Sequence, residues 1–297
     1  MFDPSLERPR RPVVSVVTPS YQQGRFLERT LESVAMQDGA LEHIVMDGGS
    51  TDGTLAILER WRDRITFKSE RDRGQTAAIN AGMSIARGEI LAYLNSDDVY
   101  YPGAIAAAVA AFERDPSVDV VYGDADHIDV EDRVIGAYPI EEWSIERLKL
   151  VCFLCQPAVF LRRRVIERFG AFDENLHYCM DYEYWLRLAL RGARFAHLPA
   201  RLAGSRLHGD AKTFRSAKAA HVEINDMLKR HLGGVPDNWL WNYAAVDSRA
   251  VVPVALRSIA AAFRWNGFPS ITLLRTIASW LLGRTRIAPP LRFRETE

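Results

Sequence analysis

Two adjacent carboxylates follow the apolar segment Ile90–Leu94, which has the composition of a buried strand. The loop reads Asn95-Ser96-Asp97-Asp98, and like charges side by side at the end of a buried strand repel each other. Divalent cations take oxygen ligands, and Mg²⁺ commonly uses one or two carboxylates together with substrate phosphates. The loop is therefore a candidate metal site. The alternative is that Asp97 or Asp98 only caps the helix that follows Pro102.

A second polar loop follows the strand-like segment His43–Asp47. Its sequence, Gly48-Gly49-Ser50-Thr51-Asp52-Gly53-Thr54, favours a tight turn in which Asp52 or Thr54 caps the next helix. Asp47 stands at the end of the strand, where its carboxylate could accept hydrogen bonds from a nucleobase or a sugar. From the residues alone, both interpretations stay open.

A third candidate is Asp181, which stands at the start of a helix predicted over Tyr182–Leu190. Asp173 and Glu174 lie a few residues before it. An acidic residue at a helix N-terminus is stabilised by the helix dipole and needs no catalytic role. The position of Asp181 by itself is thus compatible with a structural or a catalytic function.

The turn after the first predicted strand, Thr18-Pro19-Ser20-Tyr21, disfavours two common classes of nucleotide-binding enzyme. A dinucleotide-binding fold needs Gly-x-Gly-x-x-Gly at this turn, and a P-loop enzyme needs Gly-Lys followed by Ser or Thr. Neither pattern is present. Hydride transfer and P-loop ATP hydrolysis are therefore not expected.

The elements that would position these loops alternate between strand and helix up to about residue 123. Repeated units of this kind form a parallel, doubly wound α/β sheet with helices on both faces, and ligands bind at the carboxyl ends of its strands. The predicted strands are Val13–Thr18, His43–Asp47, Ile65–Lys68, Ile90–Leu94 and Val118–Tyr122, with helices over Phe26–Ala35, Leu55–Trp61, Thr76–Ala86 and Ala104–Phe112.

The pattern from residue 124 onward is less regular. Strands are predicted over Ala158–Leu161 and Arg194–Leu198, and a long helix over Lys212–His231. The sequence Gly233-Gly234-Val235-Pro236 would end that helix. We therefore predict a boundary between a body of residues 1–234 and a helical tail of residues 235–297.

Composition excludes several classes of protein. The chain has 297 residues, 38 Lys and Arg against 38 Asp and Glu, 48% hydrophobic residues and three cysteines. This mixture is typical of a folded protein, and a net charge of zero argues against a nucleic-acid partner. No apolar run reaches the roughly 18 residues of a membrane span, residues 1–12 do not have the apolar core of a signal peptide, and three cysteines make no disulfide framework. A cytoplasmic location is expected.

Taken together, the loops resemble those of the family 2 glycosyltransferases, which are inverting enzymes with the GT-A fold. The resemblance extends from about Val14 to Thr213 and rests on five motifs in a specific order. They are Ser15-Val16-Val17-Thr18-Pro19-Ser20-Tyr21, Asp47-Gly48-Gly49-Ser50-Thr51-Asp52-Gly53-Thr54, Gly74-Gln75-Thr76-Ala77-Ala78-Ile79-Asn80-Ala81-Gly82, Asn95-Ser96-Asp97-Asp98 and Met180-Asp181-Tyr182-x-x-Trp185.

This resemblance implies a nucleotide-sugar donor bound by residues 13–123, an acceptor bound by residues 124–234, and a divalent metal, Mn²⁺ or Mg²⁺. Asp97 would ligate the metal, with Asp98 and His208 as further metal candidates, and Asp181 would be the base that takes the proton of the acceptor hydroxyl. Gln156 and Trp185 are candidate acceptor contacts. The implied nucleotide-sugar contacts are Thr18, Pro19, Tyr21, Asp47, Asp72, Gln75, Asn80, Asn95 and Asp97.

Several positions depart from the family pattern. Asn95 replaces the first Asp of the metal motif, so Asp97 carries more of the metal role. Gly48 replaces an Asp that could read the nucleobase, and Ala77 and Met180 replace acidic residues that are often found at these positions. Asp181 is then the sole candidate base.

The tail from Arg249 to Glu297 holds eight arginines and two acidic residues. Two apolar stripes at helical spacing lie among these arginines, as in helices that bind anionic lipid surfaces. Peripheral membrane contact is predicted, and the alternative is packing against the body or a second subunit. The stripes are Leu256, Ile259, Ala260 and Phe263, and Leu273, Leu274, Ile277, Trp280 and Leu281.

The predicted function is metal-assisted, inverting transfer of a sugar from a nucleotide-sugar to a hydroxyl of a saccharide or lipid-linked acceptor, in the synthesis of a cell-surface glycan. One alternative is a non-catalytic module of the same fold that binds a nucleotide-sugar or a glycan. A nucleotidyltransferase is disfavoured, because Pro19-Ser20-Tyr21-Gln22-Gln23 is not the Gly-rich basic loop that such enzymes place after the first strand.

Overall fold

A computed structural model describes residues 13–209, 216–246 and 251–282. The chain forms two compact units. The sheet unit comprises Met1–Ser144, Phe153–Asn175 and Leu188–His208, and the helical unit comprises Ile145–Cys152, Leu176–Arg187 and Gly209–Glu297. Residues 216–234 group with the helices that follow them, so this division differs from the boundary predicted at residue 234, which stays a prediction.

The sheet unit is built on one nine-stranded sheet in the order β3-β2-β1-β4-β8-β6-β9-β5, with β7 paired to β6. Strands β3, β2, β1 and β4 are parallel, as is the pair β6–β9, whereas β8 runs antiparallel between β4 and β6. The bounds are β1 Val14–Ser20, β2 Leu41–Asp47, β3 Thr66–Ser69, β4 Ile90–Tyr93, β5 Val99–Tyr100, β6 Val120–Ile128, β7 Val134–Ala137, β8 Val159–Arg162 and β9 Phe195–Arg206.

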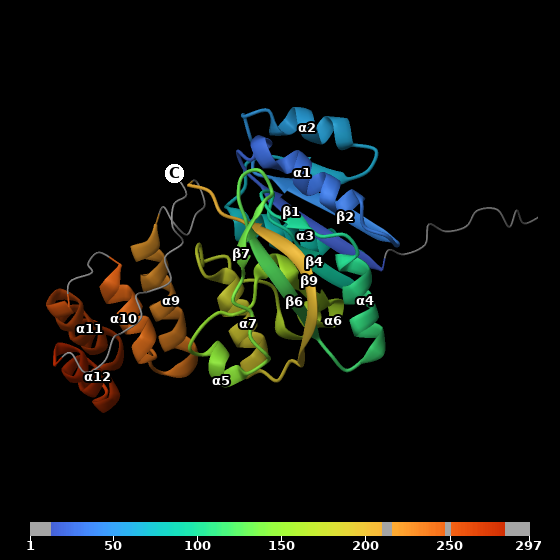
Figure 1. The fold of residues 1–297 in the computed structure, drawn as a ribbon. Coiled ribbons are helices and arrows are strands. Elements are labelled where there is room, and N and C mark those ends of the chain that lie inside the picture. Colours follow the sequence, from blue (N-terminus) through green and yellow to red (C-terminus); the bar gives the residue numbers. More distant parts are fainter. Residues whose placement is uncertain (1–12, 210–215, 247–250, 283–297) are drawn as a thin grey trace, which may run out of the picture. The chain divides into compact units, whose positions relative to one another are not determined.

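Helices cover this sheet and confirm the predicted fold class, an α/β sheet flanked by helices with further helices at the C-terminal end (Figure 1). Helices α1 (Gly24–Ala35) and α2 (Thr54–Trp61) pack side by side and bury Leu31 and Leu58 against Val45 of β2. Helix α3 (Gln75–Ile85) packs on β1 and β2. A Cβ atom on its Gly82 would come within 2.4 Å of Cγ1 of Val17, so the close approach of α3 to the sheet requires glycine there.

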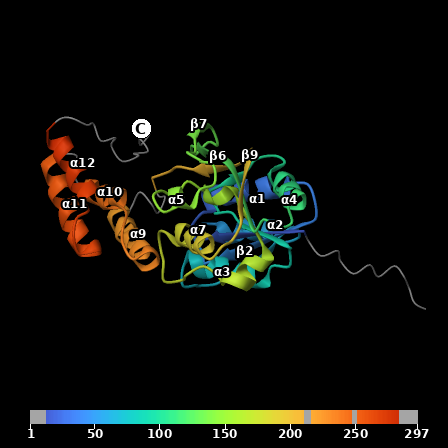
Figure 2. The same ribbon diagram turned by 90° about the horizontal axis from the view of Figure 1, so that it is seen from below.

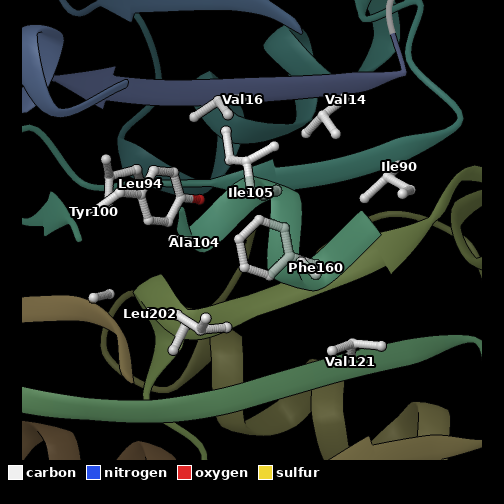
Figure 3. Packing of buried hydrophobic residues seen from close by; sticks show 14 of the residues in the cluster. Val14, Val16, Ile90, Leu94, Tyr100, Ala104, Ile105, Val121, Phe160 and Leu202 are labelled. Atoms are coloured by element: carbon white, nitrogen blue, oxygen red, sulfur yellow. The ribbon is translucent and has the colours of Figure 1, made fainter. Parts of the chain in front are cut away.

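Apolar side chains from α4 (Ala104–Arg114) fill the main core of this unit. Figure 3 shows Ile105 of α4 among Val16 of β1, Phe160 of β8 and Leu202 of β9. These strands are therefore held together from one face by α4. The short helix α6 (Arg163–Phe169) follows β8.

The helical unit contains α5 (Ile145–Leu148), most of α7 (Met180–Leu190), α9 (Ala217–Leu232), α10 (Asp237–Ala245), α11 (Val251–Asn266) and α12 (Ile271–Leu281). Helices α11 and α12 run side by side in both views (Figure 2). The indole of Trp265 is buried and donates a hydrogen bond of 2.7 Å to Asp226 of α9, and Trp241 of α10 meets Trp280 of α12 edge to face. Residues 210–215, where the predicted helix over Lys212–His231 begins, lie outside the described residues.

Among the described residues, no helix combines the length and the apolar character that crossing a bilayer would require.

Candidate active site

Three loops meet at the carboxyl ends of β1, β2 and β4. Ser20 at the end of β1 lies beside Asp47 at the end of β2, and the amide of Gly48 donates a hydrogen bond of 2.9 Å to the carbonyl of Ser20. The amide of Leu94 donates 2.9 Å to the carbonyl of Val17, which fixes the end of β4 beside β1. The parallel pairing thus places the loops that follow Ser20, Asp47 and Leu94 at one edge of the sheet.

Asp97 pairs with His208, which lies 111 residues further along the chain and just past β9. Oδ2 of Asp97 lies 3.0 Å from Nε2 of His208. The Asp97 side chain is 20% exposed, and the His208 ring is buried against the ring of Phe26 at 4.9 Å. The pair therefore presents a carboxylate and an imidazole at one point of the site.

Asp98 faces the interior instead. It is buried, its Oδ1 accepts the amide of Arg206 at 2.8 Å, and its Oδ2 accepts Nδ2 of Asn95 at 3.3 Å. Burial raises the pKa of the Asp98 carboxyl, and the negative charge of Asp97 raises it further. Because protein groups occupy both oxygens, Asp98 supports the loop, and the metal role predicted for it has no structural support.

A divalent metal fits the Asp97–His208 pair only with help from substrate. Among the described residues, no group of three or more His, Cys, Asp or Glu side chains could hold a metal ion. Two protein ligands suit Mg²⁺ or Mn²⁺, which keep open positions for phosphate oxygens and water. Oδ2 of Asp97 and Nε2 of His208 lie 3.0 Å apart, so both would be within reach of one ion.

A relay of side-chain amides braces the same loop from the other side. Nε2 of Gln75 donates 2.8 Å to Oδ1 of Asn95, Nδ2 of Asn95 donates 3.0 Å to Oε1 of Gln156, and Nε2 of Gln156 donates 2.7 Å to the carbonyl of Tyr93. Gln156 is buried, and both ends of its amide bond to protein groups. The fold thus uses Gln156 to brace the loop, and its predicted acceptor contact stays a prediction.

Tyr21 and Asp72 both approach Gly48. A Cβ atom on Gly48 would come within 3.2 Å of the Tyr21 ring and within 3.3 Å of the Asp72 carboxylate, so glycine permits this close approach. Tyr21 is 62% exposed although it is aromatic, and the Asp72 carboxylate accepts the amide of Gly74 at 2.8 Å. An exposed planar ring can stack on a nucleobase, and a carboxylate held near it can accept hydrogen bonds.

Three residues predicted to contact the nucleotide are instead used by the protein. The Asp47 carboxylate is buried and accepts hydrogen bonds from Gly49, Ser50 and Ser69. The Asn80 amide bonds to both backbone polar groups of Phe172 and to Glu174. Thr18 is completely buried, as is most of the neighbouring Pro19. The side chains of Asp47, Asn80 and Thr18 therefore shape the site from behind.

The hydroxyl of Thr18 shares a hydrogen bond of 2.8 Å with Nε2 of His43, a ring that burial keeps neutral. Burial lowers the pKa of His43 to about 3. Below pH ~6.5 the unfolded chain binds a proton at His43 that the native chain does not, so native stability falls as pH falls towards 3. Between pH 6.5 and 5 this residue should remove about 1.6 kcal/mol of the free energy of unfolding. Urea unfolding at both pH values should show that loss in the native chain and not in His43→Gln; an equal loss in both would contradict it.

Asp181 lies in the helical unit, in the first turn of α7, whereas the residues described above lie in the sheet unit. Burial raises the pKa of the Asp181 carboxyl, and the negative charge of Glu223 adds to the rise. Glu223 of α9 accepts the backbone amides of His177, Tyr178 and Cys179 at 2.8, 2.6 and 2.8 Å. Glu223 therefore fixes the segment that leads into Asp181.

Trp185, one turn further along α7, is 1% exposed and lies 5.6 Å from the ring of Tyr184. The indole of Trp185 thus packs in the interior, and the acceptor contact predicted for it stays a prediction. Glu183 is also buried, and although burial opposes it, hydrogen bonds from His231 and Arg187 lower the pKa of Glu183. Asp181 is thus the acid of this turn whose pKa is raised.

The sequence analysis did not identify two supporting residues, Arg206 and Glu223. Arg206 is buried at the end of β9, donates Nε to the carbonyl of Asp97 at 2.6 Å and its amide to Asp98. Glu223 is the other. Arg206 stands two residues before His208, which is a usable signal, whereas nothing near Glu223 in the sequence points to the loop that it holds.

The chain matches known proteins in sequence. Residues 15–170 match the family model described as glycosyl transferase family 2. The chain is 29% identical over 230 residues to the chondroitin synthase of Escherichia coli, which covers 74% of this chain and 33% of that protein. It is 32% identical over 183 residues to a PGL/p-HBAD biosynthesis glycosyltransferase of Mycobacterium tuberculosis, which covers 59% of this chain and 69% of that protein. The chain thus spans about a third of the chondroitin synthase.

Solved structures with the same fold are more distant in sequence. S. aureus TarS 1–349 in complex with UDP-GlcNAc superimposes with a TM-score of 0.61 at 18% identity and covers 91% of this chain and 92% of that one. The mannosyltransferase PcManGT from Pyrobaculum calidifontis, in complex with GDP-Man and Mn²⁺, gives a TM-score of 0.57 at 20% identity and covers 92% and 80%. At this level of identity the likeness establishes the fold.

Proposed function

The chain belongs to glycosyltransferase family 2, and on that premise we propose that it transfers a sugar from a nucleotide-sugar donor to an acceptor hydroxyl. The observation that carries the proposal is the Asp97–His208 pair at the carboxyl end of the central strands. At the same edge of the sheet, Tyr21 and Asp72 both approach Gly48. An aromatic ring and a carboxylate for a base, next to a metal-binding pair for a diphosphate, are the parts that a nucleotide-sugar site needs.

The donor side of the reaction is assigned to the sheet unit. Asp97 and His208 would hold the divalent metal, which would offset the negative charge on the departing nucleoside diphosphate. Arg206 holds the backbone of Asp97 in place, and the amide relay through Asn95 keeps the loop from moving. Tyr21 and Asp72 would bind the nucleobase. Preorganised groups of this kind lower the barrier because little reorganisation is needed during the reaction.

The acceptor side is assigned to Asp181. A carboxylate with a raised pKa binds a proton more tightly than an ordinary Asp, which suits it to remove the proton of a hydroxyl as that hydroxyl attacks. A single base is sufficient for a single displacement with inversion, because no covalent intermediate forms on the protein. Retaining glycosidases differ in that they need a second carboxylate as nucleophile.

We assign the acceptor to saccharides or lipid-linked saccharides of a cell-surface glycan, at a cytoplasmic location. The similarity to a chondroitin synthase and to a biosynthetic glycosyltransferase supports this class of acceptor. A lipid-linked acceptor lies at a membrane face, where the enzyme would have to meet it.

The proposal is tested by thermal unfolding of the full chain with UDP, GDP, dTDP or CMP, each with and without Mn²⁺. A ligand at 100 times its dissociation constant stabilises the native state by about 2.7 kcal/mol, which shifts the melting temperature of a chain this long by about 5 °C. One nucleotide should give this shift only with Mn²⁺, and that nucleotide identifies the donor class. Equal melting temperatures under all conditions would contradict a donor site.

A further inference from the structure

Helix α11 exposes an apolar stripe. Val252, Leu256 and Phe263 are exposed, with the half-buried Ile259 between them, and their spacing of four, three and four residues keeps them on one side of the helix. Leu256 alone is 63% exposed. The opposite side, which includes Ala262 and Trp265, is buried. Packing within the helical unit therefore explains the apolar residues on the buried side of α11 but not those on its exposed side.

The loop after α11 and helix α12 expose further apolar residues. Phe268 in the loop is 77% exposed, and Ile271 at the start of α12 is 69% exposed. Leu274, Leu281 and Leu282 are exposed further along. Leu273 and Ile277, which the sequence analysis placed on the same stripe, are buried, so the structure moves the exposed stripe of α12 by about one residue. We call the exposed residues of α11, α12 and their loop the apolar face.

Arginines flank this apolar face in a regular way. Arg257 follows Leu256, Arg264 follows Phe263 and Arg275 follows Leu274, and successive residues are about 100° apart around a helix. All three arginines are exposed, and Arg264 extends over the ring of Trp265 at 4.4 Å. Residues 251–281 hold these three cations and no Lys, Asp or Glu. Each arginine therefore lies about 100° around its helix from an exposed apolar residue, and the charged side chains of this stretch are all positive.

We propose that the apolar face docks on a lipid bilayer that contains anionic phospholipids. The helices would lie in the headgroup region, with Leu256, Phe263 and Phe268 inserted among the acyl chains and the arginines bound to lipid phosphates. This pattern matches helices that lie in a membrane interface. A second copy of the chain fits less well, because a symmetric interface places each surface against itself and would bring the arginines together.

The inference rests on the proposed function in one respect. Membrane docking would bring the active site to a lipid-linked acceptor. Its test measures co-flotation of the full chain with vesicles of phosphatidylcholine alone and of phosphatidylcholine mixed with phosphatidylglycerol. The native chain should float with the mixed vesicles and bind the neutral ones far more weakly. Arg257→Gln with Arg275→Gln should lower the partition coefficient about fivefold per arginine, or about 25-fold together.

A second variant removes apolar contact and keeps the charge. Leu256→Gln with Phe263→Gln should lower partitioning on the mixed vesicles by more than about tenfold. The matched controls change equally exposed residues of the sheet unit, Val134→Gln with Ile135→Gln and Arg62→Gln with Arg114→Gln, and should bind like the native chain. All substituted side chains are exposed, so melting temperatures should stay close to that of the native chain.

Three outcomes would overturn the inference: no flotation of the native chain with anionic vesicles, an equal loss in the control variants, or a dimer that the apolar-face variants dissociate while vesicle binding stays absent. Nucleotide-dependent stabilisation is measured on the same preparations. Vesicle binding without any nucleotide effect would contradict the proposed function alone. A nucleotide effect without vesicle binding would contradict the membrane inference alone.

Discussion

Asp181→Asn should lower the rate of sugar transfer by about 10²–10⁴-fold, the usual contribution of a general base. The amide cannot take the proton of the acceptor hydroxyl, whereas its size and shape match those of the carboxylate. Its Oδ1 can still accept the amide of Tyr182, which lies 2.8 Å from Oδ1 of Asp181. The measurement is the initial rate of nucleotide release with the donor that the melting experiments identify. Donor affinity should be unchanged, because Asp97, Tyr21 and Asp72 are intact.

Loss of activity in this variant should come without loss of stability. The native-state pKa of Asp181 is raised, so at neutral pH the native protein holds a carboxylate that is less stable there than in the unfolded chain. Replacing the charged group with a neutral amide should keep or raise the free energy of unfolding at pH 7. A catalytic defect with equal or greater stability is typical of a residue that is strained for function.

Glu223→Gln tests how Glu223 affects the position of the segment before Asp181 and the pKa of Asp181. Glu223 raises the pKa of Asp181 through its charge, so its removal should move the acidic limb of the pH–rate profile to lower pH. The rate itself should also fall, because the amides of residues 177–179 lose a charged acceptor. A purely structural role would not shift the limb. Transfer by Asp181→Asn at a near-native rate would remove Asp181 from the role of base.

The strands that carry the site could be predicted because their signal is local. β1, β2 and β4 are short apolar runs that end in polar loops, and the prediction located each within about two residues of its observed ends. β9 is different, because its predicted end at Leu198 precedes a proline. The observed strand continues to Arg206, and its register with β6 skips Pro199, which has no amide to donate. Only the partner strand makes this irregular pairing favourable.

Prediction of the candidate site from sequence is limited in the same way, because contacts with distant segments decide the outcome. The sequence identified Asp97 and His208 by residue type and place, and the structure brings them together. It also assigned nucleotide contacts to Asp47 and Asn80, whose side chains the fold uses up in hydrogen bonds to Ser69 and Phe172. Residue type gives the hydrogen-bonding capacity of a side chain, whereas distant segments decide how much of that capacity is left for a ligand. For the same reason, the role of Glu223 could not be predicted from the sequence, because its three hydrogen-bond partners lie 44 to 46 residues away.

Asp97→Ala should abolish the Mn²⁺-dependent part of nucleotide binding. Asp97 is one of the two protein ligands that we propose, and losing a group that supports a metal site costs about 10–100-fold in affinity. If the dissociation constant rises 100-fold, a nucleotide concentration that stabilised the native chain by about 2.7 kcal/mol would stabilise the variant by about 0.4 kcal/mol. Thermal unfolding with the identified nucleotide, with and without Mn²⁺, measures both numbers.

Asp98→Asn is the matched control for the Asp97 experiment, since it changes the adjacent carboxylate of the same loop. Both oxygens of Asp98 accept hydrogen bonds from Arg206 and Asn95, and an amide oxygen can keep the one from Arg206. This variant should therefore retain the Mn²⁺-dependent shift, whereas His208→Gln should reduce it. An equal loss in Asp97→Ala and Asp98→Asn would indicate that both carboxylates hold the metal. An unchanged shift in Asp97→Ala would contradict the metal site, because no other described carboxylate faces His208 at ligand distance.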